Sequence, residues 1–331
     1  MKQMPMKRQT WISVGVVVGC LLAGCASRRD AANDAAPPDA GQSHLQTAVT
    51  LLDQGEVDAA LAEFEEAIAE NPELTVAYLA AADIYRERGD HATAADRYGE
   101  AARLEPRSYE AQYGHGLMLQ LLGRAAEAVR AYLKALDVDP NSAEANLNLA
   151  TAYMQMGESR EGLEFARKAV ELQPGHGPSR VNLGAMYAAL GRHDEAVVEY
   201  QQAAELMELT PPLLMNLADS LGRSGRHAEM ASTLERLVQT NDSAVARERL
   251  GAAYFHLKRY EDAIASFKRA TEIDPGHYPA HNGTGVCYLN KYVVSGQTDR
   301  AALEEARAAF RASLRINSKQ PTVIDLLARY R

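Results

Sequence analysis

Apolar residues recur at the spacing of an amphipathic helix along most of the chain, in stretches that a glycine or a proline interrupts. The glycines of this pattern lie 34 residues apart, at Gly55, Gly89, Gly123, Gly157, Gly191 and Gly225. Prolines repeat with the same period at Pro72, Pro106, Pro140 and Pro174, and Pro275 returns to the pattern. Because glycine ends helices and proline marks turns, each repeat is predicted to contain a helix A, a Gly-terminated turn, a helix B and a Pro-marked turn.

Small side chains recur inside both predicted helices. The middle of helix A carries only alanine or glycine at eight equivalent positions, which are Ala48, Ala82, Gly116, Ala150, Gly184, Ala218, Gly251 and Gly285. Helix B carries small residues at two positions seven residues apart, Ala60 and Ala67 in the first repeat, with aromatic residues at other fixed positions. Small residues on one face let neighbouring helices approach closely, so the pattern predicts stacked pairs of helices.

This combination of period, small positions, aromatic positions, glycines and prolines resembles the tetratricopeptide repeat family over about residues 41–319. The resemblance implies an all-α fold, an α-α superhelix of about eight helix-turn-helix repeats with a C-terminal capping helix over 320–331. Six repeats follow the pattern closely, at 41–74, 75–108, 109–142, 143–176, 177–210 and 244–277.

Two repeats depart from the pattern. In repeat 6 (211–243), Met230 and Leu237 replace small residues of helix B and no proline follows, which predicts wider local packing. In repeat 8 (278–319), about nine extra residues around Lys291–Arg300 are expected to lengthen the connection from helix A to helix B.

The start of the chain resembles a bacterial lipoprotein signal. Three basic residues precede an apolar stretch over 11–22, which suits a signal-peptide core better than a membrane span. The stretch ends in Leu22-Ala23-Gly24-Cys25, which is similar to a lipobox and implies cleavage before Cys25 and lipidation of its thiol. The alternatives are an ordinary secretory signal or a membrane anchor in which Cys25 is incidental. We expect a signal peptide over 1–24 and a flexible linker over 25–43, rich in Ala, Asp and Pro.

Cleavage at this position would set the location, charge and thiol content of the protein. By the sorting rule of enteric bacteria, Ala26 after the cysteine resembles an outer-membrane address, which implies a lipid-anchored envelope protein facing the periplasm. Loss of three cations would lower the formal net charge from −9 to −12, and no segment concentrates basic residues, which argues against nucleic-acid binding. Cys20 would leave with the signal and Cys25 would be acylated, so Cys287 would be the one free thiol and no disulfide is expected.

No motif typical of catalysis, phosphate binding or metal binding occurs in the sequence, so we expect no enzyme activity, no metal and no small-molecule cofactor. His193 and His227 occupy equivalent positions in adjacent repeats, too far apart to share a zinc ion. His115 and Cys287 lie within predicted helices A, where we interpret them as packed core residues.

Peptides usually bind along helices A in the resembled family, which predicts a groove over this face. Asn148, Asn182 and Asn216 occupy one helix A position in three successive repeats, and their amides could donate to and accept from a peptide backbone. The predicted groove residues also include Leu79, Tyr113, Leu117, Leu147, Val181 and Met215. The alternative is that these residues recur for packing and never contact a ligand.

The function that follows is a lipid-anchored scaffold that binds protein or peptide segments of the cell envelope. Similar lipoproteins help to assemble type IV pilus secretin rings, and others dock peptidoglycan hydrolases or other cell-wall enzymes. An unrecognised enzyme or glycan-binding module and a purely structural spacer remain alternatives, since a repeat fold does not dictate function.

Lipidation can be tested by metabolic labelling with a palmitate analogue. We expect the wild-type chain to be labelled and the Cys25→Ser variant to lose the label, because the lipobox resemblance assigns the lipid to this thiol. Equal labelling of the two chains would refute the anchor.

Overall fold

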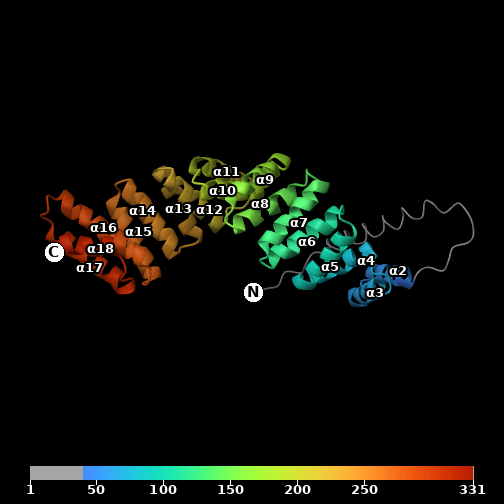
Figure 1. Cartoon of the computed structure of the whole chain (residues 1–331). Helices are drawn as coiled ribbons and strands as arrows, with labels where there is room; N and C mark the ends of the chain where they lie inside the picture. The colour runs from blue at the N-terminus through green and yellow to red at the C-terminus, as the bar shows by residue number, and fades with distance from the viewer. Residues whose placement is uncertain (1–39, 331) are drawn as a thin grey trace, which may run out of the picture. The chain divides into compact units, whose positions relative to one another are not determined.

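A computed structural model describes residues 40–330, so the predicted signal peptide, Cys25 and most of the predicted linker lie outside the described residues. Over 40–330 the chain forms seventeen α-helices and no strand (Figure 1). The predicted all-α fold of consecutive helix-turn-helix repeats is confirmed. Within this range no helix has both the length and the apolar character needed to span a bilayer.

The helices belong to two compact units, which meet in the sequence between Leu172 and Gln173. The N-terminal unit contains α2 (Ala40–Gln54), α3 (Val57–Glu70), α4 (Thr75–Glu87), α5 (His91–Leu104), α6 (Tyr109–Leu121), α7 (Ala125–Val138), α8 (Ala143–Gln155) and α9 (Ser159–Leu172). The C-terminal unit contains α10 (Gly177–Ala189), α11 (His193–Leu206), α12 (Pro211–Arg223), α13 (His227–Thr240), α14 (Ala244–His256), α15 (Tyr260–Ile273), α16 (Tyr278–Val294), α17 (Arg300–Ile316) and α18 (Pro321–Arg329). Helices A are even-numbered from α2 to α16, helices B are odd-numbered, and successive helices pack against each other within each unit.

The turn inside each pair needs a left-handed backbone. Six glycines with φ between +73° and +80° end helices A in the first six repeats, from Gly55 to Gly225. In repeat 7 the corresponding position is Lys258, with φ of +62°. A side chain in this region costs roughly 1–2 kcal/mol, which the packing around the turn must offset.

Hydrogen bonds and charges also define where helices start. The hydroxyls of Ser108 and Ser142 accept from backbone N–H groups three residues on and cap α6 and α8. Several helices B instead start after an arginine that pairs with an acid three residues on, as Arg192 does with Glu195 at 2.6 Å. These pairs are exposed, so each contributes only about 0–1 kcal/mol.

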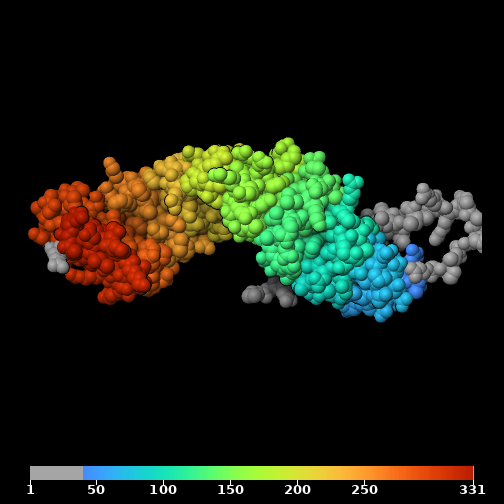
Figure 2. All heavy atoms as spheres, viewed as in Figure 1, coloured from blue at the N-terminus to red at the C-terminus, as the bar shows by residue number. Residues whose placement is uncertain are grey.

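The core of each pair is a close contact between a small residue of helix A and a large residue of helix B. Gly116 of α6 lies against Tyr132 of α7, where a Cβ atom would come within 2.8 Å of the ring. Gly184 of α10 lies against Tyr200 of α11 at the same distance. Figure 2 shows the side chains filling the space that the ribbon leaves between successive helices of each unit.

Repeat 6 fills the same space with different side chains. Met230 and Leu237 of α13 are buried, with 7% and 1% exposure, where the six regular repeats have alanine or, at Gly162, glycine. Gly222 of α12 makes room for the first of them, because its Cβ would lie 2.8 Å from the sulfur of Met230.

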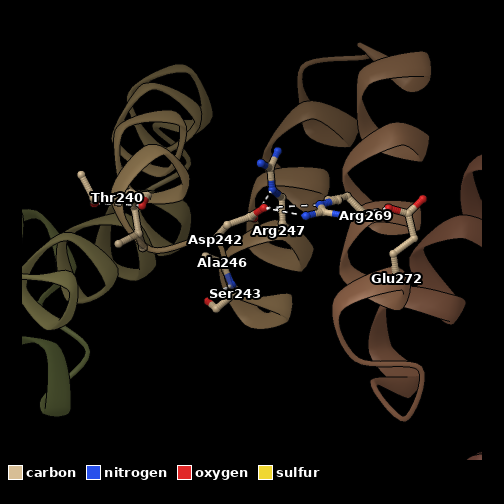
Figure 3. A network of polar contacts seen from close by, with 8 residues as sticks. Thr240, Asp242, Ser243, Ala246, Arg247, Arg269 and Glu272 are labelled. Carbon is tan, nitrogen blue, oxygen red and sulfur yellow. Dashed lines mark hydrogen bonds and ion pairs between the residues drawn. The ribbon is translucent and has the colours of Figure 1, made fainter.

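The connection from α13 to α14 has a polar network in place of the proline (Figure 3). Asp242 accepts a hydrogen bond from Arg247 Nε of α14 at 2.5 Å and from Arg269 of α15 at 3.3 Å. The bond from Arg247 is the largest cause that holds the pKa of Asp242 below its usual range. Ser243 caps α14 by accepting from the Ala246 N–H at 3.3 Å. One carboxylate therefore links this connection to both helices of repeat 7.

The extra residues of repeat 8 mainly lengthen its helices. Both α16 and α17 have 17 residues, and residues 295–299 connect them, whereas residues 88–90 connect α4 to α5. The predicted lengthening of the connection is therefore small, and most of the extra residues extend the two helices. Tyr292, in the added turn of α16, is buried with Leu303 and packs against Tyr330. Val323 of α18 packs on Phe310 of α17, so α18 covers the end of the last helix pair.

The small-to-large contact predicts a loss of stability on adding one methyl group. In Gly285→Ala, the new Cβ would lie 2.5 Å from Phe310. Overpacking costs about 1–3 kcal/mol and outweighs a helix-propensity gain of about 1 kcal/mol. We expect urea unfolding followed by circular dichroism to show a net loss of about 1 kcal/mol.

Gly175→Ala in the same unit is the matched control, because a Cβ there meets nothing within 4 Å. Its free energy of unfolding should stay within about 0.5 kcal/mol of the parent. A Gly285→Ala variant that is as stable as the parent would contradict the packing argument.

Candidate functional site

All the predicted groove residues lie on helices A, but their environments differ. They divide between the units as Leu79, Tyr113, Leu117, Leu147 and Asn148 in the N-terminal unit and Val181, Asn182, Met215 and Asn216 in the C-terminal unit. Leu79 is 9% exposed and belongs to the core cluster that contains Tyr78 and Ala82. Leu117, Leu147, Val181 and Met215 are half-buried. Leu79 therefore contributes mainly to packing, whereas the half-buried side chains retain accessible surface.

In the N-terminal unit the structure brings two predicted residues together. Asn148 Nδ2 of α8 donates to Tyr113 Oη of α6 at 2.9 Å. The Tyr113 ring stacks on Tyr109 with a centroid distance of 5.5 Å and packs obliquely on Tyr132 at 5.9 Å. Burial raises the pKa of Tyr113 and outweighs the opposite effect of the Asn148 bond. This amide is thus already paired with the protein, and its remaining donor and carbonyl are what it could offer a ligand.

Charged residues that the sequence pattern did not single out lie on neighbouring helices A. Asp83 of α4 accepts from Tyr98 Oη and from Arg86, both at 2.6 Å. Burial raises the pKa of Glu110 on α6, Asp83 adds to this effect, and Arg86 opposes it. A half-buried carboxyl with a raised pKa can accept or donate a hydrogen bond, so this face is polar as well as aromatic.

In the C-terminal unit the two predicted amides differ in exposure. Asn182 of α10 is 8% exposed, whereas Asn216 of α12 is exposed. Both have the same position in their repeats, so the difference arises from what packs around them. Asn216 is the amide of this pair that can reach a ligand directly.

A cavity of about 470 Å³ opens beside Asn216. Its wall includes Asp219 and Arg223 of α12, and Arg249 and His256 of α14. Ala188, His193, Tyr200, His227 and Met230 of the neighbouring helices also line it. We call this the cationic cavity, because two arginines and three histidines face one carboxylate there. Of the predicted groove residues, only Asn216 lines it.

A second cavity of about 240 Å³ lies next to the first and shares Ala252 and His256 with it. Its wall is mostly apolar and comes from Phe255 of α14, Phe267 of α15, and Pro279, Gly283 and Val286 of α16. Glu248 and Asn282 are its polar residues besides His256. We call it the apolar cavity.

The charges of the cationic cavity are only partly neutralised. Arg249 Nε lies 3.0 Å from Asp219 Oδ1, in a pair that is about two-fifths exposed. Arg223 is exposed and forms no ion pair with any residue of 40–330. His227 and His256 stack face to face with a centroid distance of 4.1 Å. Burial lowers the pKa of His227 and the charge of His256 lowers it further. The cavity therefore has one arginine in excess over its carboxylate.

Buried histidine nitrogens do not by themselves mark this site. Nδ1 of His193 and of His227 is buried without a hydrogen-bond partner in the described chain, and so is Nδ1 of His91 in the N-terminal unit. All three are the first residues of their helices B. This burial therefore belongs to the repeat position, and His91 has it away from either cavity.

One sequence signal could have found Arg249. It occupies the same position of helix A as Asn148, Asn182 and Asn216, one repeat further on. The step from Asn216 to Arg249 is 33 positions instead of 34 because repeat 6 is one residue shorter. Arg223 lies seven residues after Asn216, which places both on one face of α12. The lining by α11 and α13 could not be obtained this way, because it depends on how separate helices pack.

Comparison with known families agrees with this architecture. Models described as tetratricopeptide repeats match residues 26–74, 141–209 and 244–277, and a model described as a TPR repeat matches 116–157. The chain contains tetratricopeptide repeats. No curated protein matches the sequence significantly.

Solved structures of tetratricopeptide repeat proteins share the fold. YrrB, described as a TPR protein with an unusual peptide-binding site, is 21% identical with a TM-score of 0.51, covering 60% of this chain and 98% of YrrB. A tetratricopeptide repeat protein from Parabacteroides merdae is 16% identical with a TM-score of 0.51, covering 75% and 98%.

The repeats offer little reactive chemistry in the described range. No group of three or more His, Cys, Asp or Glu side chains over 40–330 could hold a metal ion. His115 is half-buried, and burial lowers its pKa. Cys287 is fully buried in α16, and burial raises the pKa of its thiol to about 12.

The raised pKa predicts a slow reaction of Cys287 with iodoacetamide at pH 8. The thiolate is the reactive form, and a raised pKa leaves little of it at this pH. In a chain with Cys20→Ser and Cys25→Ser, we expect alkylation roughly a hundredfold slower than in the same chain unfolded in guanidinium. Mass spectrometry would follow the modification, and equal rates in the two states would contradict the buried environment.

Proposed function

We propose that this chain is a lipid-anchored scaffold that binds a protein segment along its helices A and helps to assemble or stabilise a cell-envelope complex, such as a type IV pilus secretin. Tetratricopeptide repeats are suited to protein–protein interaction, and we propose no catalytic role. The observation that carries the binding role is the pair of adjoining cavities in the C-terminal unit, where polar and apolar groups of several helices converge.

Two features support a peptide or protein segment as the ligand. Exposed or half-buried amides and apolar side chains occur together on helices A, as for Asn216 and Met215. This pairing suits an extended chain, whose backbone needs hydrogen bonds and whose side chains need apolar contacts. YrrB, which has the same fold, is described as having a peptide-binding site.

The envelope location rests on the sequence Leu22-Ala23-Gly24-Cys25, which lies outside the described residues. A lipid on Cys25 would hold the repeats beside a membrane, so partners would be proteins at its surface. An outer-membrane position facing the periplasm is part of this proposal.

Capture from solubilised envelopes by the immobilised full chain tests the binding role. We expect mass spectrometry to identify a reproducible set of envelope proteins whose yield falls several-fold with Asn216→Ala. Each amide-to-peptide hydrogen bond contributes about 1 kcal/mol, and Asn216 can form more than one.

Gln239→Ala is the matched control, because it removes an exposed amide from α13 that lines neither cavity. Its captured set should equal that of the wild type. Equal capture by all three chains would remove the role assigned to Asn216, and absence of any specific set would remove the scaffold proposal.

A further inference from the structure

The adjoining cavities of the C-terminal unit differ in chemistry, and the difference specifies a ligand. The cationic cavity contains Arg223 and Arg249 against the single carboxylate of Asp219. The apolar cavity contains two phenylalanines, a proline and a valine. Because they share Ala252 and His256, one short segment can reach both.

We propose that the C-terminal unit binds a peptide segment that places a carboxylate in the cationic cavity and an apolar side chain in the apolar cavity. This inference rests on the proposed function, in which a protein segment is the ligand, and it specifies the chemistry of that segment.

Arg223 is the principal contact for the carboxylate. Its guanidinium is exposed and has no ion pair among the described residues, so binding an anion requires no internal pair to break. Arg249 already lies 3.0 Å from Asp219, and it adds a second donor group on the facing helix. Arginine matches carboxylate geometry through two parallel hydrogen bonds, and Asn216 beside it can bind the adjacent peptide group.

Gly283 lets the ring of Phe267 lie directly against α16 at the wall of the apolar cavity. A Cβ at Gly283 would lie 2.4 Å from the Phe267 ring, so the ring occupies the space that a side chain would fill in another helix. Val286, one helical turn later, remains exposed at 37%. Together these residues leave an apolar concavity that an aliphatic or aromatic side chain can enter.

Glu248 disfavours the acidic group of the ligand in the apolar cavity. It lines the apolar cavity, and burial raises its pKa while Arg249 and His277 oppose that effect. A second carboxylate there would meet the half-buried carboxyl of Glu248, which disfavours it. The acidic group of the ligand therefore belongs in the cationic cavity, and Glu248 can accept a hydrogen bond from a ligand N–H.

The test uses fluorescein-labelled decapeptides of Ser and Gly, blocked at both ends, with one Glu and one Leu in either order. Companion peptides replace Glu by Gln or Leu by Ser, and one peptide has no Glu but a free C-terminal carboxylate. Fluorescence anisotropy with the full chain measures each dissociation constant. We expect each replacement to weaken binding of the better Glu/Leu peptide roughly tenfold, and the last peptide distinguishes an internal acid from a chain end.

Two pairs of protein variants locate the effect. Arg223→Gln should remove the preference for Glu over Gln, whereas Arg236→Gln, an exposed arginine of α13 outside both cavities, should leave it unchanged. Val286→Ser should weaken the Leu peptide selectively, whereas Val198→Ser, an exposed valine of α11, should not. All four positions are exposed, and unchanged thermal unfolding would confirm that each variant folds.

Equal affinity for the Glu and Gln peptides, no binding of any peptide, or equal effects of Arg223→Gln and Arg236→Gln would each overturn the proposal. Envelope capture distinguishes this failure from that of the scaffold. Retained capture without a peptide preference would reject only this site, and a retained peptide preference without capture would reject only the envelope role.

Discussion

The close approach of helix A and helix B is the constraint on which the rest of the structure depends. A glycine or alanine in the middle of helix A lies against a large side chain of helix B, and at Gly116, Gly184 and Gly251 a Cβ atom would come within 2.8 Å of the facing ring. Interiors at this density tolerate no extra methyl group without displacement. Each pair thus forms a rigid unit of defined separation, and the turn that joins its helices must fit that separation.

The two irregular repeats adapt to this constraint in different ways. Repeat 6 keeps Ala218 in the middle of helix A and has a second small residue, Gly222, which makes room for the large Met230 of helix B. The flexible thioether fits an irregular gap, and a cavity remains beside it. Repeat 8 keeps the glycine-to-aromatic contact between Gly285 and Phe310 and extends both helices beyond it. Irregular packing and concave polar surface therefore occur together in the C-terminal unit.

Polar groups on helices A are partly used by the protein itself. Asn148 binds Tyr113, Asp83 binds Tyr98 and Arg86, and Arg249 pairs with Asp219. Such bonds hold side chains in defined orientations, which lowers the entropy that a ligand must offset on binding. Groups without such partners, notably Arg223 and Asn216, are the ones that can gain most from a ligand.

The sequence by itself determined the period, the two helices of each repeat, the glycine turns and the small-to-large packing, because these depend on residues close in the chain and on a repeated local pattern. It did not reveal that Lys258 takes the left-handed turn or that the extra residues of repeat 8 extend helices. Only the tertiary structure decided which of the asparagines at one helix A position are accessible, since Asn182 is buried and Asn216 is exposed. It also placed Leu79 in the core. It also decided the two cavities, since their walls combine side chains of several successive helices and exposure depends on the neighbours that packing brings together.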